Sequence, residues 1–401
     1  MILLVQIAAI LAAARAARWL VKPLGQPPVV GEMIAGLLLG PSGYGWLMPA
    51  QSAALFAPES LPPLNALSQL GLVLFMFLVG IRLGAPRGGA ATRRVAVVTS
   101  ATSIAVPFAL GVWLASILHA RLAPAGVSVL PFSLFVGAAM SITAFPVLAR
   151  ILIDRDLLTT ELGVMAIACA AFDDVTGWMM LGGVMALVHA GDGRMLAVHA
   201  LVFAGYLAVM TWAVRPALRW FAARRGAAFG SPDDLVLVML VMLLSAAATE
   251  ALGMHALFGA FFAGLMMPKT PSVERAFVDR VEPLTTAVLL PLFFAFTGLR
   301  TEVRLIDSAD LWRDAALVMA VAVVGKGGSS IVASRAMGLA WRDAGALGAL
   351  LNTRGLIELV VLNIGLELGV LSPVMFSMLV LMAIGTTCMT SPIVAWLQPR
   401  S

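Results

Sequence analysis

The sequence predicts an all-α polytopic membrane protein of about thirteen transmembrane helices, two of them broken near mid-membrane. Three observations support this. Of the 401 residues, 61% are hydrophobic and only 12% are charged, with a mean hydropathy of +0.99, which soluble domains do not reach. Apolar stretches of helix length recur between short loops that hold most of the charges. Two of these stretches contain helix-breaking residues, at Pro146 and Gly355.

Hydropathy divides the chain into thirteen candidate spans. The least distinct boundary separates the eighth span from the ninth. The spans cover about 2–20, 29–48, 64–83, 95–118, 130–151, 160–188, 196–218, 235–252, 254–268, 284–299, 312–337, 343–366 and 372–397.

The distribution of basic residues tests this division and sets an orientation. The odd-numbered loops and the carboxyl-terminal segment hold 19 arginine or lysine residues, and the even-numbered loops hold 5. Cytoplasmic loops are enriched in positive charge. We therefore expect a multi-pass protein of the cell (inner) membrane, with its amino terminus outside and its carboxyl terminus in the cytoplasm.

Two basic residues remain, Lys326 and Arg354, and both lie inside apolar spans. A buried cation in a membrane helix needs a counter-charge or a helix carboxyl terminus nearby. The acidic residues within spans that can supply one are Asp173, Asp174 and Glu358.

The adjacent carboxylates Asp173 and Asp174 interrupt the sixth span. Asp173 lies roughly 16 Å into it at ~1.5 Å per residue, about half of a ~30 Å hydrocarbon core. A carboxylate at that depth costs about 2.5–3.5 kcal/mol on insertion scales. Such a cost points to a function, and we expect the pair to bind and release protons and a small cation. A fixed ion-pair network with Lys326 is the purely structural alternative.

The fifth and twelfth spans are predicted to be broken. In the fifth, Pro146 frees the carbonyl of Ile142 and moves Phe145 away from helical geometry. In the twelfth, the run Asn352-Thr353-Arg354-Gly355 is tolerated at that depth only where it is buried in protein or lines a cavity. A kinked but continuous helix is the alternative for each span.

Broken helices at corresponding positions of two halves are typical of transporters built from inverted repeats. Helices 4–6 and 11–13 would form the repeats, with helix 7 as the link between them. Six spans separate helices 5 and 12, so the two run in opposite directions, as inversion requires.

Six stretches, in order, resemble the monovalent cation/proton antiporter superfamily. The resemblance is to its second branch, which includes plant cation/proton exchangers, Kef-type potassium systems and NapA-type sodium/proton antiporters. The stretches are Gly25 to Ser42, Gly71 to Leu83, Ser141 to Leu152, the Asp173-Asp174 pair, Lys326, and Asn352 to Gly365.

The resemblance implies a NhaA/NapA-like antiporter fold that forms a homodimer in the lipid bilayer. Residues 1–401 would then be a single integral membrane transporter domain without a soluble regulatory domain. Helices 1–3 and 8–10 would form a dimerisation panel, and helices 4–6 and 11–13 an ion-translocating core. The broken helices 5 and 12 would cross at mid-membrane beside the acidic pair.

Adjacent residues on a helix point ~100° apart, so both aspartates cannot face one partner. By resemblance to the family motif, Asp174 carries the proton and the cation, and Asp173 pairs with Lys326. Thr143 and Ser141, with carbonyls freed at the break, would add ligands to Asp174 and Asp173. Such hard oxygen ligands suit Na⁺, K⁺ or Li⁺.

Two interpretations are open for Arg354. It can be neutralised by Glu358, one turn further along the helix, or it can stabilise the negative carbonyl ends at the helix crossing. NapA-type relatives differ here, because they have an acid closer to this arginine.

The resulting functional prediction is a secondary antiporter that exchanges Na⁺ or K⁺, and possibly Li⁺, for protons. A cation channel or ion-gated sensor of the same fold, or an organic-anion symporter, is the alternative. No nucleotide loop, nucleophile arrangement or redox motif occurs, so we expect neither an enzyme nor a cofactor. The basic residues are scattered through many loops, which argues against nucleic-acid binding.

Overall fold

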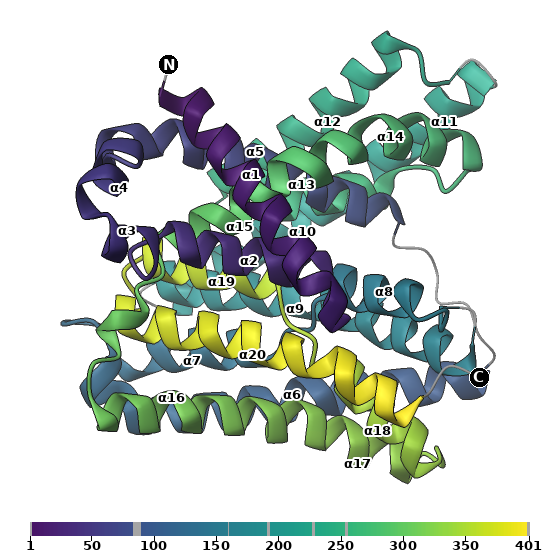
Figure 1. Ribbon diagram of the computed structural model, residues 1–401. Helices are drawn as coiled ribbons and strands as arrows, with labels where there is room; N and C mark the ends of the chain where they lie inside the picture. Colours follow the sequence, from purple (N-terminus) through teal and green to yellow (C-terminus); the bar gives the residue numbers. More distant parts are fainter. Residues whose placement is uncertain are drawn as a thin grey trace. The chain divides into compact units, whose positions relative to one another are not determined.

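A computed structural model describes residues 2–82, 90–158, 160–190, 193–226, 229–252 and 256–398 of the chain. Within these ranges all regular secondary structure is helical (Figure 1). The chain divides into two compact units, one of Met1–Pro58, Pro86–Leu181 and Phe294–Ser401, and the other of Glu59–Ala85 and Gly182–Phe293.

The first unit holds both broken helices. Its elements are α1 (Ile2–Val21), η1 (Lys22–Leu24), α2 (Pro28–Leu39), α3 (Tyr44–Leu47), α4 (Pro49–Leu55), α6 (Ala90–Leu122), α7 (Val129–Ser141), α8 (Phe145–Asp154), most of α9 (Glu161–Ala190), most of α15 (Leu290–Leu299), η6 (Val303–Leu305), α16 (Ala309–Ala322), η7 (Val323–Gly328), α17 (Ser329–Ala336), α18 (Trp341–Leu351), α19 (Leu356–Glu367) and α20 (Pro373–Leu397). Helices α6, α7, α16 and α20 pack side by side (Figure 1).

The second unit is also built from helices. Its complete elements are α5 (Leu61–Arg82), α10 (Gly193–Val209), η3 (Met210–Val214), α11 (Arg215–Arg225), α12 (Pro232–Ala251), α13 (Ala256–Met266), α14 (Pro271–Leu284) and η5 (Thr285–Leu289). Helix α12 begins with a capping box, in which the Ser231 hydroxyl accepts from the amide of Asp234 and the Asp234 carboxylate accepts from the amide of Ser231.

The described residues of the predicted spans are mostly helical, and the number of thirteen transmembrane helices stays a prediction. Eight of the helical segments in the described ranges are long and apolar enough to cross a membrane, and the chain is therefore a multi-pass membrane protein. The uncertain boundary between the eighth and ninth spans separates two helices, since α12 ends at Ala251 and α13 begins at Ala256.

The fifth span is broken as predicted, but the break lies before Phe145, and Pro146 belongs to the helix that follows it. Helix α7 ends at Ser141, residues 142–144 are non-helical, and α8 begins at Phe145. The expectation that Phe145 leaves helical geometry is therefore wrong. Proline is tolerated in the first turn of a helix, because its missing N–H would have no intrahelical partner there. Pro146 thus lies in the first turn of the second half-helix, and its side chain is outside the described residues.

The twelfth span is broken at the predicted polar run, and the two breaks lie against each other. Helix α18 ends at Leu351 and α19 begins at Leu356. The amide of Ala144, in the first break, donates to the carbonyl of Thr353, in the second, at 2.9 Å. A Cβ on Gly355 would lie only 3.0 Å from the Val147 side chain. The broken helices therefore cross in direct contact.

Helices α2 and α15 pack through glycine, and this packing yields a stability prediction. A Cβ on Gly298 would lie 2.1 Å from the carbonyl carbon of Gly36, so Gly298→Ala forces two backbones apart. We expect a loss of about 1–3 kcal/mol, measured as a lower unfolding temperature of the purified protein. The control is Gly205→Ala in α10, where a Cβ meets nothing within 4 Å and a gain of up to about 1 kcal/mol is expected. Equal unfolding temperatures for the two variants would contradict this packing.

Candidate functional site

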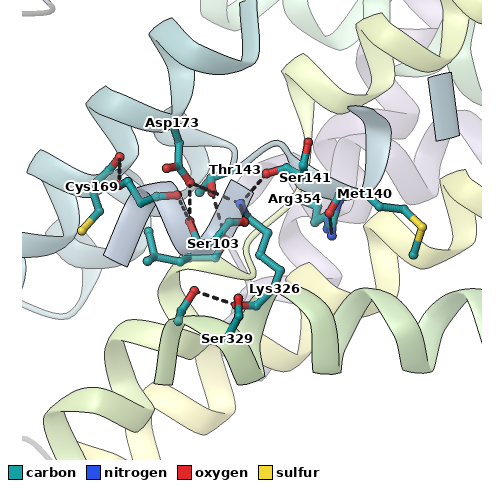
Figure 2. Close-up of polar contacts among 12 residues, drawn as sticks. Ser103, Met140, Ser141, Thr143, Cys169, Asp173, Lys326, Ser329 and Arg354 are labelled. Atoms are coloured by element: carbon teal, nitrogen blue, oxygen red, sulfur yellow. Dashed lines mark hydrogen bonds and ion pairs between the residues drawn. The ribbon is translucent and has the colours of Figure 1, made fainter. Parts of the chain in front are cut away.

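Asp173, on α9, lies at the centre of a buried polar cluster (Figure 2). Its side chain is 0% exposed. The Oδ2 atom lies 2.5 Å from the Thr143 hydroxyl, 3.3 Å from the Ser103 hydroxyl and 3.2 Å from Nζ of Lys326. Its other oxygen, Oδ1, has no hydrogen-bond partner among the described residues. Oδ2 of Asp173 thus contacts three polar groups, whereas Oδ1 contacts none among the described residues.

Lys326 reaches this cluster from a π-helical turn, η7. Glycines at 325, 327 and 328 flank it, and π turns within α-helices frequently mark functional sites. The ammonium group, which is 0% exposed, donates to the carbonyls of Ser103 (3.0 Å) and Ser141 (2.5 Å) and to Asp173. All three of its protons therefore have acceptors.

The carboxyl end of α7 is capped entirely by side chains. A helix leaves its last four carbonyls without intrahelical partners. The hydroxyl of Ser141 donates to the carbonyl of Ala138 at 2.9 Å. Arg354 donates through Nη1 to the carbonyl of Ala139 (2.6 Å) and through Nη2 to that of Met140 (2.5 Å). Lys326 donates to the fourth carbonyl, that of Ser141.

Arg354 also contacts Glu358. Its Nη1 lies 3.5 Å from Oε1 of Glu358, and both side chains are buried. The backbone of Arg354 is held by Thr387, whose hydroxyl accepts from the Arg354 amide (3.0 Å) and lies 2.6 Å from its carbonyl. One guanidinium thus lies beside Glu358 and donates to two carbonyls of α7.

At the carboxyl end of α18 the described groups beside the carbonyls are backbone amides and hydroxyl groups, not cations. Thr143 lies 3.1 Å from the carbonyl of Leu351, and Thr390 donates to that of Ala349 at 3.1 Å. The two half-helix ends therefore differ in charge, since two cations face α7 and neutral donors face α18.

The described charges of the cluster form two pairs. Among the described buried groups, Lys326 pairs with Asp173 and Arg354 pairs with Glu358. Asp174 follows Asp173 on α9, and its side chain is outside the described residues.

The other predicted site residues take positions around the crossing. Ser141 and Thr143 are fully buried and donate hydrogen bonds within the protein. The Thr353 hydroxyl lies 3.3 Å from that of Thr390. Asn352 is buried, and its Oδ1 has no partner among the residues described.

Two residues of the cluster were not predicted from the sequence. Ser103 positions both Asp173 and Lys326, and Thr387 fixes the backbone of Arg354. The only available signal was a hydroxyl residue inside an apolar span, which many spans of this chain contain. Single hydroxyls are common in membrane helices, where they also bond within their own helix.

Two broken helices that cross beside buried carboxylates are typical of secondary membrane transporters. The comparisons with known proteins agree with this class. A family model described as the transmembrane sodium/hydrogen exchanger matches residues 8–397. The chain belongs to the sodium/hydrogen exchanger family, which consists of transporters and not enzymes.

Several curated relatives match over nearly the whole chain. The Na⁺/H⁺ antiporter NhaS4 of Synechocystis is 40% identical, over all of this chain and 98% of its own length. Cation/H⁺ antiporter 19 of Arabidopsis thaliana is 38% identical over 98% of this chain. K⁺/H⁺ antiporter 1 of Saccharomyces cerevisiae is 31% identical over 94% of it. The match spans about half the length of the plant and yeast relatives, 49% and 44%.

The fold agrees with that of a solved transporter. The sodium proton antiporter MjNhaP1 of Methanocaldococcus jannaschii superposes with a TM-score of 0.71, covering 98% of this chain and 97% of that protein. The sequence identity is 14%, so this likeness concerns the fold. The predicted antiporter fold and family resemblance are both confirmed.

Proposed function

We propose that the protein is a secondary antiporter that exchanges a monovalent cation, Na⁺ or K⁺ and possibly Li⁺, for protons by alternating access. The observation that carries the proposal is the buried ion pair of Asp173 with Lys326 beside the crossing of two broken helices. Asp174 follows Asp173 on the same helix, and we infer that it is the exchanging carboxylate. A carboxylate that binds either a proton or a mobile cation expels one when it loads the other.

The neighbouring groups have distinct roles in this mechanism. Asp174 is the carrier, because Oδ2 of Asp173 is already engaged with Lys326, Thr143 and Ser103. Oδ1 of Asp173 has no partner among the described residues, which supports a second ligand position for the cation. Thr143 contributes its hydroxyl oxygen, which keeps lone pairs free while it donates its proton. Oxygen ligands of this kind suit hard monovalent cations.

We also propose the larger arrangement that such a mechanism needs. Helices 4–6 and 11–13 form the mobile core, helices 1–3 and 8–10 form the dimerisation panel, and helix 7 links the two. The protein works as a homodimer in the inner membrane, with its amino terminus outside and its carboxyl terminus in the cytoplasm. The excess of basic residues in the odd-numbered loops supports this orientation.

Proton movement in proteoliposomes tests the proposal directly. An imposed pH gradient is followed by a fluorescent dye while Na⁺, Li⁺ or K⁺ is added separately, with and without a clamped membrane voltage. We expect at least one cation to dissipate the gradient, and its identity defines the substrate. A current without counter-movement of protons would indicate a channel, and no response to any of the three cations would overturn the antiporter assignment.

A further inference from the structure

The two half-helix ends at the crossing differ in how they would receive a mobile cation. The free carbonyls at the carboxyl end of a helix carry together about half an elementary negative charge. At α7 the ammonium group of Lys326 and the guanidinium group of Arg354 donate to these carbonyls and offset that charge. At α18 the described groups beside the carbonyls are neutral amides and hydroxyls. A mobile cation is therefore attracted more strongly to the end of α18 than to that of α7.

Asn352 is the C-cap residue of α18, and its amide oxygen lacks a hydrogen bond. The residue is 6% exposed, and its Oδ1 has no partner among the described residues. Buried polar atoms in folded proteins are nearly always hydrogen-bonded, because an unpaired one lowers stability. An oxygen with free lone pairs that is buried at the negative end of a helix has the properties of a cation ligand.

The Thr143 hydroxyl places this end of α18 beside Asp173. It lies 2.5 Å from Oδ2 of Asp173 and 3.1 Å from the carbonyl of Leu351, the last residue of α18. A hydroxyl has one proton to donate, and its contact with the carboxylate is the shorter of the two. The carbonyl of Leu351 therefore keeps lone pairs for another positive partner.

The side chain of Asn352 packs against η7, the π-helical turn of Lys326. A Cβ on Gly327 would lie 3.8 Å from Cβ of Asn352 and 3.9 Å from its Cγ. From the same turn, Nζ of Lys326 reaches Oδ2 of Asp173 at 3.2 Å (Figure 2). Asn352 is therefore a part of the buried cluster around Asp173 that has no assigned role.

We propose that Asn352 is a neutral oxygen ligand of the transported cation, bound at the carboxyl end of α18. The inference rests on the proposed antiport and deepens it, because it names a residue that sets the choice of ion. Selectivity among hard cations depends on the size of the cavity and on the number of oxygens around the ion. An amide does not titrate in the physiological range, so Asn352 acts on the affinity for the cation and leaves proton exchange to Asp174.

The variant Asn352→Leu tests this role, because leucine has a similar size but no oxygen. Cation-dependent proton movement is measured in proteoliposomes over a range of Na⁺, Li⁺ and K⁺ concentrations. We expect the apparent KM for the transported cation to rise about tenfold, as for the loss of one polar contact to a charge, while the maximal rate changes little. The control is Asn65→Leu on α5, whose amide oxygen is also buried without a partner among the described residues. Its apparent KM should stay unchanged.

Two further measurements separate ligand binding from structural support. Asn352→Ser keeps a neutral oxygen but leaves more room for the ion, so we expect the ratio of apparent KM values to shift in favour of the larger cations. A bound cation also raises the unfolding temperature of the purified protein. We expect this rise to be smaller for Asn352→Leu than for the unmodified protein. The unfolding temperature without added cation reports whether each variant folds.

The outcomes distinguish this inference from the proposed function. An unmodified protein that responds to a cation, with the same apparent KM after Asn352→Leu, would overturn the ligand role and leave the antiport intact. An equal rise in KM after Asn65→Leu would overturn it too. If Asn352→Leu does not fold, an unchanged ion preference of Asn352→Ser overturns the role instead. No response of the unmodified protein to any of the three cations would overturn the antiport, and this inference with it.

Discussion

Replacement of Asp174 by asparagine is expected to abolish cation-dependent proton movement while the protein stays folded. Asparagine keeps the size and most of the polarity of the side chain but can neither gain nor lose a proton. The ion pair between Asp173 and Lys326, and the caps on α7, do not depend on the carboxylate of Asp174. Proteoliposome flux measures the first part of the expectation, and the unfolding temperature of the purified variant measures the second.

A matched control comes from α16. Asp310 lies in its first turn, is 72% exposed and pairs with Arg313 at the surface. Exposed ion pairs contribute about 0–1 kcal/mol, so Asp310→Asn should transport like the unmodified protein. Cation-dependent proton flux retained by Asp174→Asn would refute the carrier role. A loss of transport in both variants would mean that the assay responds to any lost carboxylate.

The second large effect is expected for Arg354→Met. Methionine keeps much of the apolar stem but removes the charge and all five donors of the guanidinium group. The carbonyls of Ala139 and Met140 lose their partners, and Glu358 becomes a buried carboxylate without its cation. Removing one member of a buried ion pair costs about 3–5 kcal/mol. We expect a large fall in unfolding temperature and little folded protein in the membrane.

The double variant Arg354→Met/Glu358→Gln separates the two roles of the arginine. It removes the stranded carboxylate but leaves the α7 carbonyls uncapped, and an unsatisfied buried polar group costs about 1–3 kcal/mol. We therefore expect only partial recovery of stability. Full recovery would mean that Arg354 serves only to neutralise Glu358. Arg313→Met, at an exposed position on α16, is the control and should change stability by less than about 0.5 kcal/mol.

The helices and the two breaks were predictable from the sequence because their causes are local. Apolar runs of membrane length have few alternatives to a helix, and the run from Asn352 to Gly355 marks its break directly. The position of the first break was misjudged, because proline is compatible with either side of a helix end. The structure resolves this in favour of the first turn of α8.

The contacts of the site were less predictable, because they depend on which side chains meet across the crossing. The basic residues within apolar spans identified Lys326 and Arg354 as candidate site residues. The sequence does not indicate which carbonyls they cap, because Arg354 and Ala139 lie 215 residues apart in the chain. Ser103 and Thr387 are invisible to such counting, because a hydroxyl carries no charge that demands a partner.

The bond between Ala144 and Thr353 has a mechanical consequence. Together with Arg354 on the α7 carbonyls and Thr143 beside Leu351, it joins the two unwound segments at several points. The crossing then has few internal degrees of freedom, and one half-helix cannot swing open while the other stays in place. We therefore expect access to the carboxylates from opposite sides of the membrane to come from displacement of the whole crossing as one piece. Cross-linking α7 to α19 should therefore leave transport intact.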